Sequence, residues 1–124
     1  MQGHTNAPAP YEPKFIAPRA NSDIALISSD NVRFNAHQAF LSASNVFFDT
    51  IFSDVQHHTP GVQMAENAEQ LDCLLAHSYA TLHWSLDEAR FRECINMMEL
   101  ADKFGNPRLL GAATQRLASI VTAQ

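Results

Sequence analysis

The chain has 124 residues, 46% of them hydrophobic, which suits one domain with a single core. Eight basic and thirteen acidic residues give a net charge of −5, and no run of Lys and Arg could neutralise phosphates, which argues against nucleic-acid binding. No stretch approaches the about 20 apolar residues that cross a bilayer, and no signal or transit peptide is evident. We therefore expect a soluble protein of the cytoplasm or nucleus that does not contact membranes.

Residues 1–20 are expected to form a flexible, proline-rich arm ahead of a domain that spans residues 21–124. Proline lacks an amide donor and disfavours helical geometry in the residue before it, so this stretch should be extended. Phe15 and Ile16 lie within the arm and are apolar enough to dock on a partner.

Two short strands are predicted to follow the arm as a β-hairpin. Residues 24–27, Ile-Ala-Leu-Ile, form a continuous apolar run that is typical of a buried strand. Residues 28–31, Ser-Ser-Asp-Asn, have the chemistry of a turn. Residues 32–36 then alternate between apolar and polar side chains, which indicates a half-buried strand.

Two short helices are predicted next. The first starts after His37 and ends near Ala43, and Asn45 is well suited to cap the amino end of the second. Large apolar side chains on the second helix span too wide an arc for all to face inward, so a core role and a role in a partner surface are equally expected for this stripe. These residues are Phe47, Phe48, Ile51 and Phe52.

A polar loop over residues 53–61 and a short strand with Val62 and Met64 should precede three further helices. The first of these helices has one apolar face, and the second is expected to begin at Ser85 with a capping box completed by Glu88. The first face consists of Leu71, Leu74, Leu75, Ser78 and Tyr79. The second is expected to bury Phe91, Cys94, Ile95, Met98 and Ala101, with Met97, Leu100 and Phe104 on a flank.

The last helix is marked at its start by three residues in a row. Gly105 should adopt the left-handed conformation that ends a helix, and Asn106 and Pro107 are favoured at the first positions of the next one. The buried side of that helix is expected to hold Leu109, Leu110, Ala113, Leu117, Ile120 and Val121. The predicted class is α+β, with a small sheet packed on a cluster of about five helices.

No arrangement of side chains indicates a metal site or an active site. Adjacent His57 and His58 do not easily converge on one ion, and His77 and His83 lie far away in sequence, so exposed loop histidines are expected. The two cysteines fall inside helical patterns and should pack as small hydrophobic residues. No glycine-rich phosphate loop and no nucleophile elbow occurs. We expect no catalytic residue, no cofactor and no metal.

The order of these segments resembles the BTB/POZ domain family over about residues 22–121. The opening of that family is similar to three segments of this chain: Ser-Asp-Ile-Ala-Leu-Ile, then Val-Arg-Phe-Asn-Ala-His, then the pair at positions 40–41. The aromatic pair at 47–48, the helix that ends at Tyr79 and the run Leu-Ala-Asp-Lys-Phe at 100–104 resemble its later motifs. The resemblance implies structural roles for Asp23, His37, Leu41, Tyr79, Ala101 and Asp102.

The resemblance implies a protein–protein interaction module without catalytic activity, acting as an oligomerisation or adaptor domain. Its partner would be a second copy of the chain, giving a homodimer, or a cullin-type scaffold in a ubiquitin ligase. A role in transcription regulation is a further function that the resemblance implies. Gln38 stands where many members have Lys or Arg, so a partner charge for Asp23 is missing. The loop 53–61 lacks the Glu of the cullin-binding motif, which favours bare oligomerisation. Candidate partner-contact residues are Phe15, Ile16, Phe40, Phe47 and Phe48.

A small ligand-binding or hydrolytic domain that uses His37 and Asp23 is the competing hypothesis. It predicts a polar pocket and a loss of activity on His37→Gln with the fold intact. The interaction module predicts that the same substitution mainly lowers stability.

Overall fold

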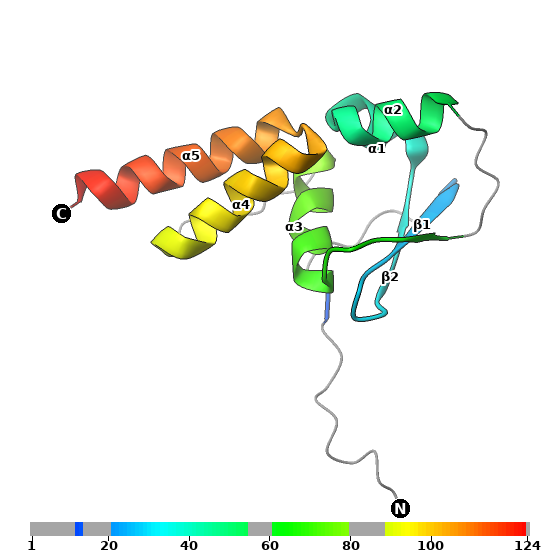
Figure 1. Cartoon of the computed structure of the whole chain (residues 1–124), viewed down its shortest axis with the longest axis horizontal. Coiled ribbons are helices and arrows are strands. Elements are labelled where there is room, and N and C mark those ends of the chain that lie inside the picture. The colour runs from blue at the N-terminus through cyan, green and yellow to red at the C-terminus, as the bar shows by residue number, and fades with distance from the viewer. Residues whose placement is uncertain (1–11, 14–20, 55–60, 80–88, 124) are drawn as a thin grey trace, which may run out of the picture.

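The computed structural model describes residues 12–13, 21–54, 61–79 and 89–123 (Figure 1). Within these ranges lie a three-stranded sheet and five helices, which confirms the predicted α+β class. The elements are β1 (Ile24–Ile27), β2 (Arg33–Ala36), α1 (Gln38–Ser44), α2 (Val46–Asp54), β3 (Val62–Gln63), α3 (Ala68–Ser78), α4 (Phe91–Phe104) and α5 (Pro107–Thr122). None of the described helices has the length and apolar character that crossing a membrane requires.

The predicted hairpin forms one side of the sheet. β1 is the central strand: it pairs antiparallel with β2, where Leu26 lies opposite Phe34, and parallel with β3, where Leu26 lies opposite Val62. Three of its four residues are buried, because the strand is the central one of the sheet. This position explains why its sequence is a continuous apolar run. β3 is shorter than predicted, but Met64 just after it still donates its amide to the Ile27 carbonyl at 2.8 Å.

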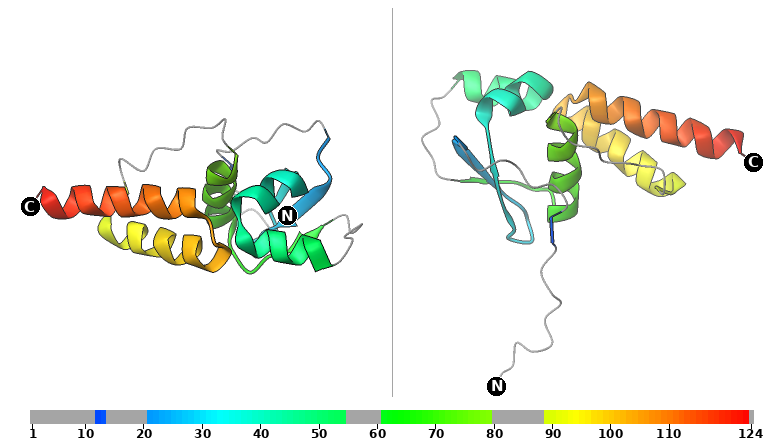
Figure 2. Two further views of the ribbon diagram at one scale, coloured as in Figure 1. Left: turned by 90° about the horizontal axis from the view of Figure 1, so that it is seen from above. Right: turned by 180° about the vertical axis from the view of Figure 1, so that it is seen from behind.

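Helix α3 stands at the centre of the fold. It lies between the sheet with α1 and α2 on one side and the α4–α5 hairpin on the other (Figures 1 and 2). Residues 71–79 are all buried, so the prediction of a single apolar face was too narrow. The helix starts with a capping box that the sequence reading missed: the Asn67 side chain accepts the Gln70 amide at 2.8 Å, and the Gln70 side chain accepts the Asn67 amide at 2.9 Å.

Helix α4 begins at Phe91, later than the capping box predicted at Ser85 and Glu88, two residues that lie outside the described part of the chain. Glu93 occupies the third position of the helix and accepts the Arg90 amide at 2.9 Å. The prediction that Phe91 is buried was wrong, since it is 55% exposed. Among the described residues, few lie near this first turn of α4, so the side chain stays exposed.

The predicted boundary between α4 and α5 is confirmed. Gly105 is left-handed, with φ 65° and ψ 48°, and a Cβ placed there would lie 2.8 Å from the Cβ of Val46. The Asn106 side chain accepts the Leu109 amide at 2.9 Å, and Pro107 is the first helical residue. The neighbouring helix and the positive φ both favour glycine at this position.

The buried side of α5 is narrower than predicted. Leu109 and Ala113 are fully buried, but Leu110 and Val121 are 39% and 55% exposed and were wrongly assigned to the core. The far end of α5 extends away from the sheet, and α4 is the described helix that lies beside it (Figures 1 and 2). A helix with one neighbour buries one stripe, so apolar residues beside that stripe stay exposed.

Candidate interaction surface

The junction between β2 and α1 is tied to the end of α3 by one tyrosine. The His37 amide donates to the Tyr79 hydroxyl oxygen at 2.9 Å, and His37 Nδ1 lies 2.8 Å from the same oxygen, across 42 residues of sequence. The hydroxyl has one hydrogen, which it can donate to Nδ1 when the neutral ring carries its proton on Nε2. Burial raises the pKa of Tyr79 to about 12, so the hydroxyl keeps its proton at neutral pH.

Asp23 holds the first turn of α1. Its Oδ1 accepts the backbone amide of Gln38, the first residue of the helix, at 2.8 Å, and the Gln38 side chain donates to the Asp23 carbonyl at 3.4 Å. The residue that follows His37 is therefore a neutral amide that bonds to the backbone of Asp23. His37 and Asp23, the candidates for catalysis, both make bonds typical of a structural junction.

Phe40 is the exposed aromatic residue of this junction. Its side chain is 51% exposed, yet its ring lies 5.6 Å from the ring of His37 at nearly a right angle and 5.0 Å from the ring of Tyr79. The phenyl ring thus packs against two anchored rings while about half of its surface stays open.

Of the phenylalanines of α2, Phe48 is buried in the core, and Phe47 and Phe52 are half-buried. Phe48 is 1% exposed and stacks on Phe104 with ring centroids 5.5 Å apart, so its assignment to the partner surface was wrong. It fills the space between α2 and α4 and has no surface left for a partner. Phe47 is half-buried, with its ring edge-on to Phe104 at 4.9 Å. Phe15 and Ile16 lie outside the described residues.

Other positions that resemble the family motif are mostly internal. Leu41 is fully buried and Ala101 is 1% exposed, so both belong to the core. Asp102 is exposed, and its backbone carbonyl accepts the Gly105 amide at 3.3 Å.

A buried polar network that sequence reasoning missed joins α1, α3 and α5. Asn45 Nδ2 donates to the Leu41 carbonyl at 3.0 Å and to Ser78 Oγ at 2.9 Å, and Asn106 Nδ2 donates to Asn45 Oδ1 at 3.0 Å. Asn45 precedes α2 as predicted, but its side chain serves this network. Two residues with cap chemistry, 61 positions apart, meet only in the folded chain.

The described histidines and cysteines suggest no second site. His77 is 6% exposed, its Nδ1 lies 2.8 Å from the Cys73 carbonyl oxygen, and burial lowers its pKa. Cys73 and Cys94 are buried thiols. The other histidines of the predicted loops, at positions 57, 58 and 83, lie outside the described residues. Within the described ranges, no group of three His, Cys, Asp or Glu side chains is placed to hold a metal ion.

Comparisons with known proteins identify the family. The BTB/POZ domain model matches residues 15–120, a range that starts inside the predicted arm, so the boundary at residue 21 stays a prediction. Among solved structures, the BTB domain of zebrafish PATZ1 is similar, with a TM-score of 0.54 and 19% identity, over 83% of this chain and 77% of that one. Curated protein sequences give no match. The chain therefore belongs to the BTB/POZ domain family.

Proposed function

We propose that this domain joins two copies of the chain through a surface centred on Phe40. BTB/POZ domains are protein–protein interaction modules. The observation that supports self-association is the aromatic ring of Phe40, which is 51% exposed although His37 and Tyr79 hold it in position. An exposed aromatic side chain that already packs on neighbouring rings suits the anchor of a protein contact, because it loses less side-chain entropy on binding than a fully free one.

The residues around Phe40 suit an interface core. Helix α1 has the sequence Gln-Ala-Phe-Leu-Ser-Ala-Ser and carries no charged side chain. Ala39 and Ala43 are exposed one turn apart beside Phe40 and allow a second backbone to approach closely. The equally exposed Phe91 lies instead among Arg90, Arg92 and Glu93. Because interface cores are depleted of charge, α1 is the better surface.

The energy is of the right size for an anchor. Phe40 exposes about half of a side-chain surface of about 200 Å², and covering that area is worth about 2.5 kcal/mol. A two-fold interface contains each residue twice, so Phe40 contributes about 5 kcal/mol before the cost of association, which is itself at least about 4 kcal/mol. Neighbouring small residues must therefore be covered as well.

Adaptor and regulatory roles in the cytoplasm or nucleus would add a further partner to this dimer. The loop in which a cullin-binding Glu is expected includes residues 55–60, outside the described part of the chain. A hydrolytic role for His37 and Asp23 is not proposed, because their bonds to Tyr79 and Gln38 serve the junction.

Molar mass in solution tests the proposal, measured by light scattering over a range of concentrations for the wild type, Phe40→Asp and Phe91→Asp. The wild type and Phe91→Asp should approach twice the monomer mass, and Phe40→Asp should stay monomeric. The control substitutes the same residue type at similar exposure, 55% against 51%. Circular dichroism and urea unfolding check that both variants fold. A monomeric wild type, or dissociation by Phe91→Asp alone, would contradict the proposal.

A further inference from the structure

The His37 ring, which packs against Phe40, is of the side-chain type that changes charge near neutral pH. The two ring centroids are 5.6 Å apart, and the ring planes are nearly perpendicular. Histidine gains or loses its charge between about pH 5 and 8. The His37 residue is half-buried, whereas Phe40 is 51% exposed. A change of charge at His37 therefore takes place directly beside the anchor of the proposed interface.

The hydrogen bonds of the junction suit the neutral form of this ring. The Tyr79 hydroxyl oxygen accepts the His37 amide at 2.9 Å and lies 2.8 Å from His37 Nδ1. In a neutral ring with its proton on Nε2, Nδ1 accepts the hydroxyl hydrogen. A protonated ring carries a hydrogen on both nitrogens, so Nδ1 must instead donate to the oxygen, and the hydroxyl hydrogen must turn away. Protonation therefore rearranges the bonds that support the Phe40 ring.

Self-association through Phe40 would also remove water from the His37 ring. A partner that covers Phe40 excludes solvent from the ring that packs against it, and loss of solvent disfavours the charged form of histidine. A two-fold interface presents the same helix from the second copy. Helix α1 has no charged side chain, so it brings no carboxylate to pair with an imidazolium. The associated state thus favours the neutral ring more strongly than the single chain does.

Asp23 belongs to the same junction, and its negative charge favours a protonated His37. Its Oδ1 accepts the Gln38 amide at 2.8 Å, and the residue is exposed, so water screens the charge. This attraction acts in the single chain as well as in the dimer and adds little to the difference between them. The same holds for any cation–π attraction between a charged His37 and Phe40. On β2, exposed Arg33 has the opposite sign to Asp23.

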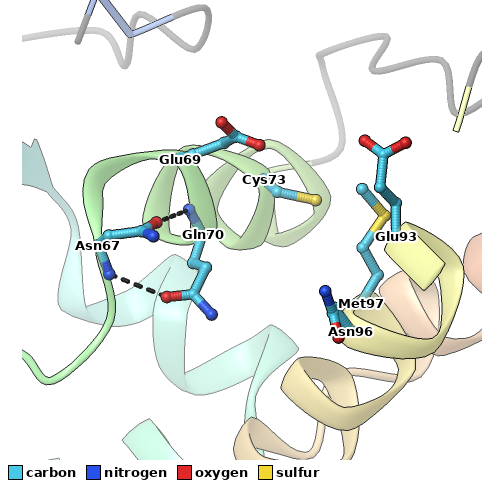
Figure 3. A pocket seen from close by; sticks show the side chains of 7 residues that line it. All are labelled: Asn67, Glu69, Gln70, Cys73, Glu93, Asn96 and Met97. Carbon is cyan, nitrogen blue, oxygen red and sulfur yellow. Dashed lines mark hydrogen bonds between the residues drawn. The ribbon is translucent and has the colours of Figure 1, made fainter. Parts of the chain in front are cut away.

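The ionisable groups of α3 and α4 do not offset the effect. Burial raises the pKa of Tyr79 to about 12, so it stays uncharged at neutral pH. The Nδ1 atom of His77 lies 2.8 Å from a carbonyl oxygen of its own helix. Glu69 and Glu93 line a hollow of about 220 Å³ at the start of α3, the opposite end of that helix from Tyr79 (Figure 3). The solvent term at His37 therefore decides the sign.

We propose that protonation of His37 weakens the self-association of this chain, so that the dimer responds to pH. The inference rests on the proposed function, since it concerns regulation of the same Phe40 surface. The associated form binds the proton less tightly than the single chain, so association is strongest above the pH range in which histidine titrates and weakens as the pH falls through it. A dimer contains two such rings, so an effect of about threefold for each copy weakens association about tenfold.

Sedimentation equilibrium of the full chain at about pH 7.5 and about pH 5.5, at one ionic strength, tests the proposal. The dissociation constant of the wild-type dimer should rise about tenfold at the lower pH, and that of His37→Gln should change by less than about twofold. His77→Gln removes the other histidine of the described residues and should keep the wild-type dependence on pH. Circular dichroism at both pH values checks that each protein is folded.

A second measurement does not depend on the folding of His37→Gln. The ¹⁵N imidazole signals at about pH 6 report the neutral fraction of His37, which should be larger in the associated wild type than in Phe40→Ala, a variant that removes the phenyl ring without adding a charge. Equal association of the wild type at both pH values, an unchanged pH dependence in His37→Gln, or equal neutral fractions would overturn this inference alone. A wild type that is monomeric at both pH values would overturn the dimer and its regulation together.

Discussion

Removal of the Tyr79 hydroxyl tests whether the His37 junction is structural. Tyr79→Phe deletes one oxygen that accepts the His37 amide at 2.9 Å and pairs with His37 Nδ1 at 2.8 Å. Tyr79 is 3% exposed, so water cannot easily take the place of that oxygen. A polar group left unsatisfied in a buried position costs about 1–3 kcal/mol. With the second hydrogen bond also lost, we expect the free energy of unfolding to fall by about 2–3 kcal/mol.

The same residue predicts a dependence on alkaline pH. Burial raises the pKa of Tyr79 from its ordinary value of 10.0 to about 12, so the folded state holds the phenol proton more tightly than the unfolded state. This contribution to stability is complete below the unfolded pKa of 10.0 and is lost as the pH rises through about 12. A shift of about two pKa units corresponds to a loss on the order of 3 kcal/mol. The Tyr79→Phe variant lacks this group and should show a flatter profile.

Urea unfolding followed by circular dichroism measures both effects. All samples need one protein concentration, because association of the folded chain adds to its apparent stability. His37→Gln serves as the companion variant and should also lower the free energy of unfolding. The structural role of the junction is refuted if Tyr79→Phe unfolds at the wild-type urea concentration and follows the wild-type profile up to pH 12.

Three further predictions concern stability. In urea unfolding, Gly105→Ala should lower the free energy of unfolding by about 1–3 kcal/mol, because a side chain at this positive φ would collide with a neighbouring helix. Gly111→Ala has open space around its Cβ and should raise the free energy of unfolding by about 0.5–1 kcal/mol, so changes of equal sign would contradict the prediction. Asn106→Ala should lower the free energy of unfolding by about 2–4 kcal/mol, because it removes the α5 cap and part of the buried network. The control Asn96→Ala replaces an exposed residue and should change stability by less than about 0.5 kcal/mol, so comparable losses would argue against the network. Burial lowers the pKa of His77 below its ordinary 6.5, so the folded state favours the neutral form and stability should fall as the pH drops below 6.5. The stability of His77→Gln should depend less on pH in the same range, and a profile identical to that of the wild type would exclude the effect.

Local chemistry in the sequence predicted the elements and their ends where one short segment decides the outcome. The hairpin and the Gly105–Asn106–Pro107 boundary are examples, since turn, cap and left-handed preferences act within a few residues. The role of Asn45 depends instead on Ser78 and Asn106, which approach it only through packing of three helices. No local pattern encodes such a meeting.

The candidate surface was predicted in part for the same reason. Exposure of Phe40 agrees with its assignment to a contact surface, but helical periodicity could not separate it from Phe48, which is 1% exposed. Periodicity states that residues share a face, and it does not state how many neighbours that face has. Phe91 and Val121 are exposed, and few of the described elements lie beside the far end of the α4–α5 hairpin.

Intermolecular contacts between copies of the chain test the central proposal most directly. Equal amounts of ¹³C,¹⁵N-labelled and unlabelled protein form mixed dimers, in which isotope-filtered nuclear Overhauser spectra record only contacts across the interface. We predict that the ring protons of Phe40 contact the methyl groups of Ala39 or Ala43 in the second copy. Contacts confined to Phe91, Leu110 or Val121 would place the interface on the α4–α5 hairpin and contradict the account.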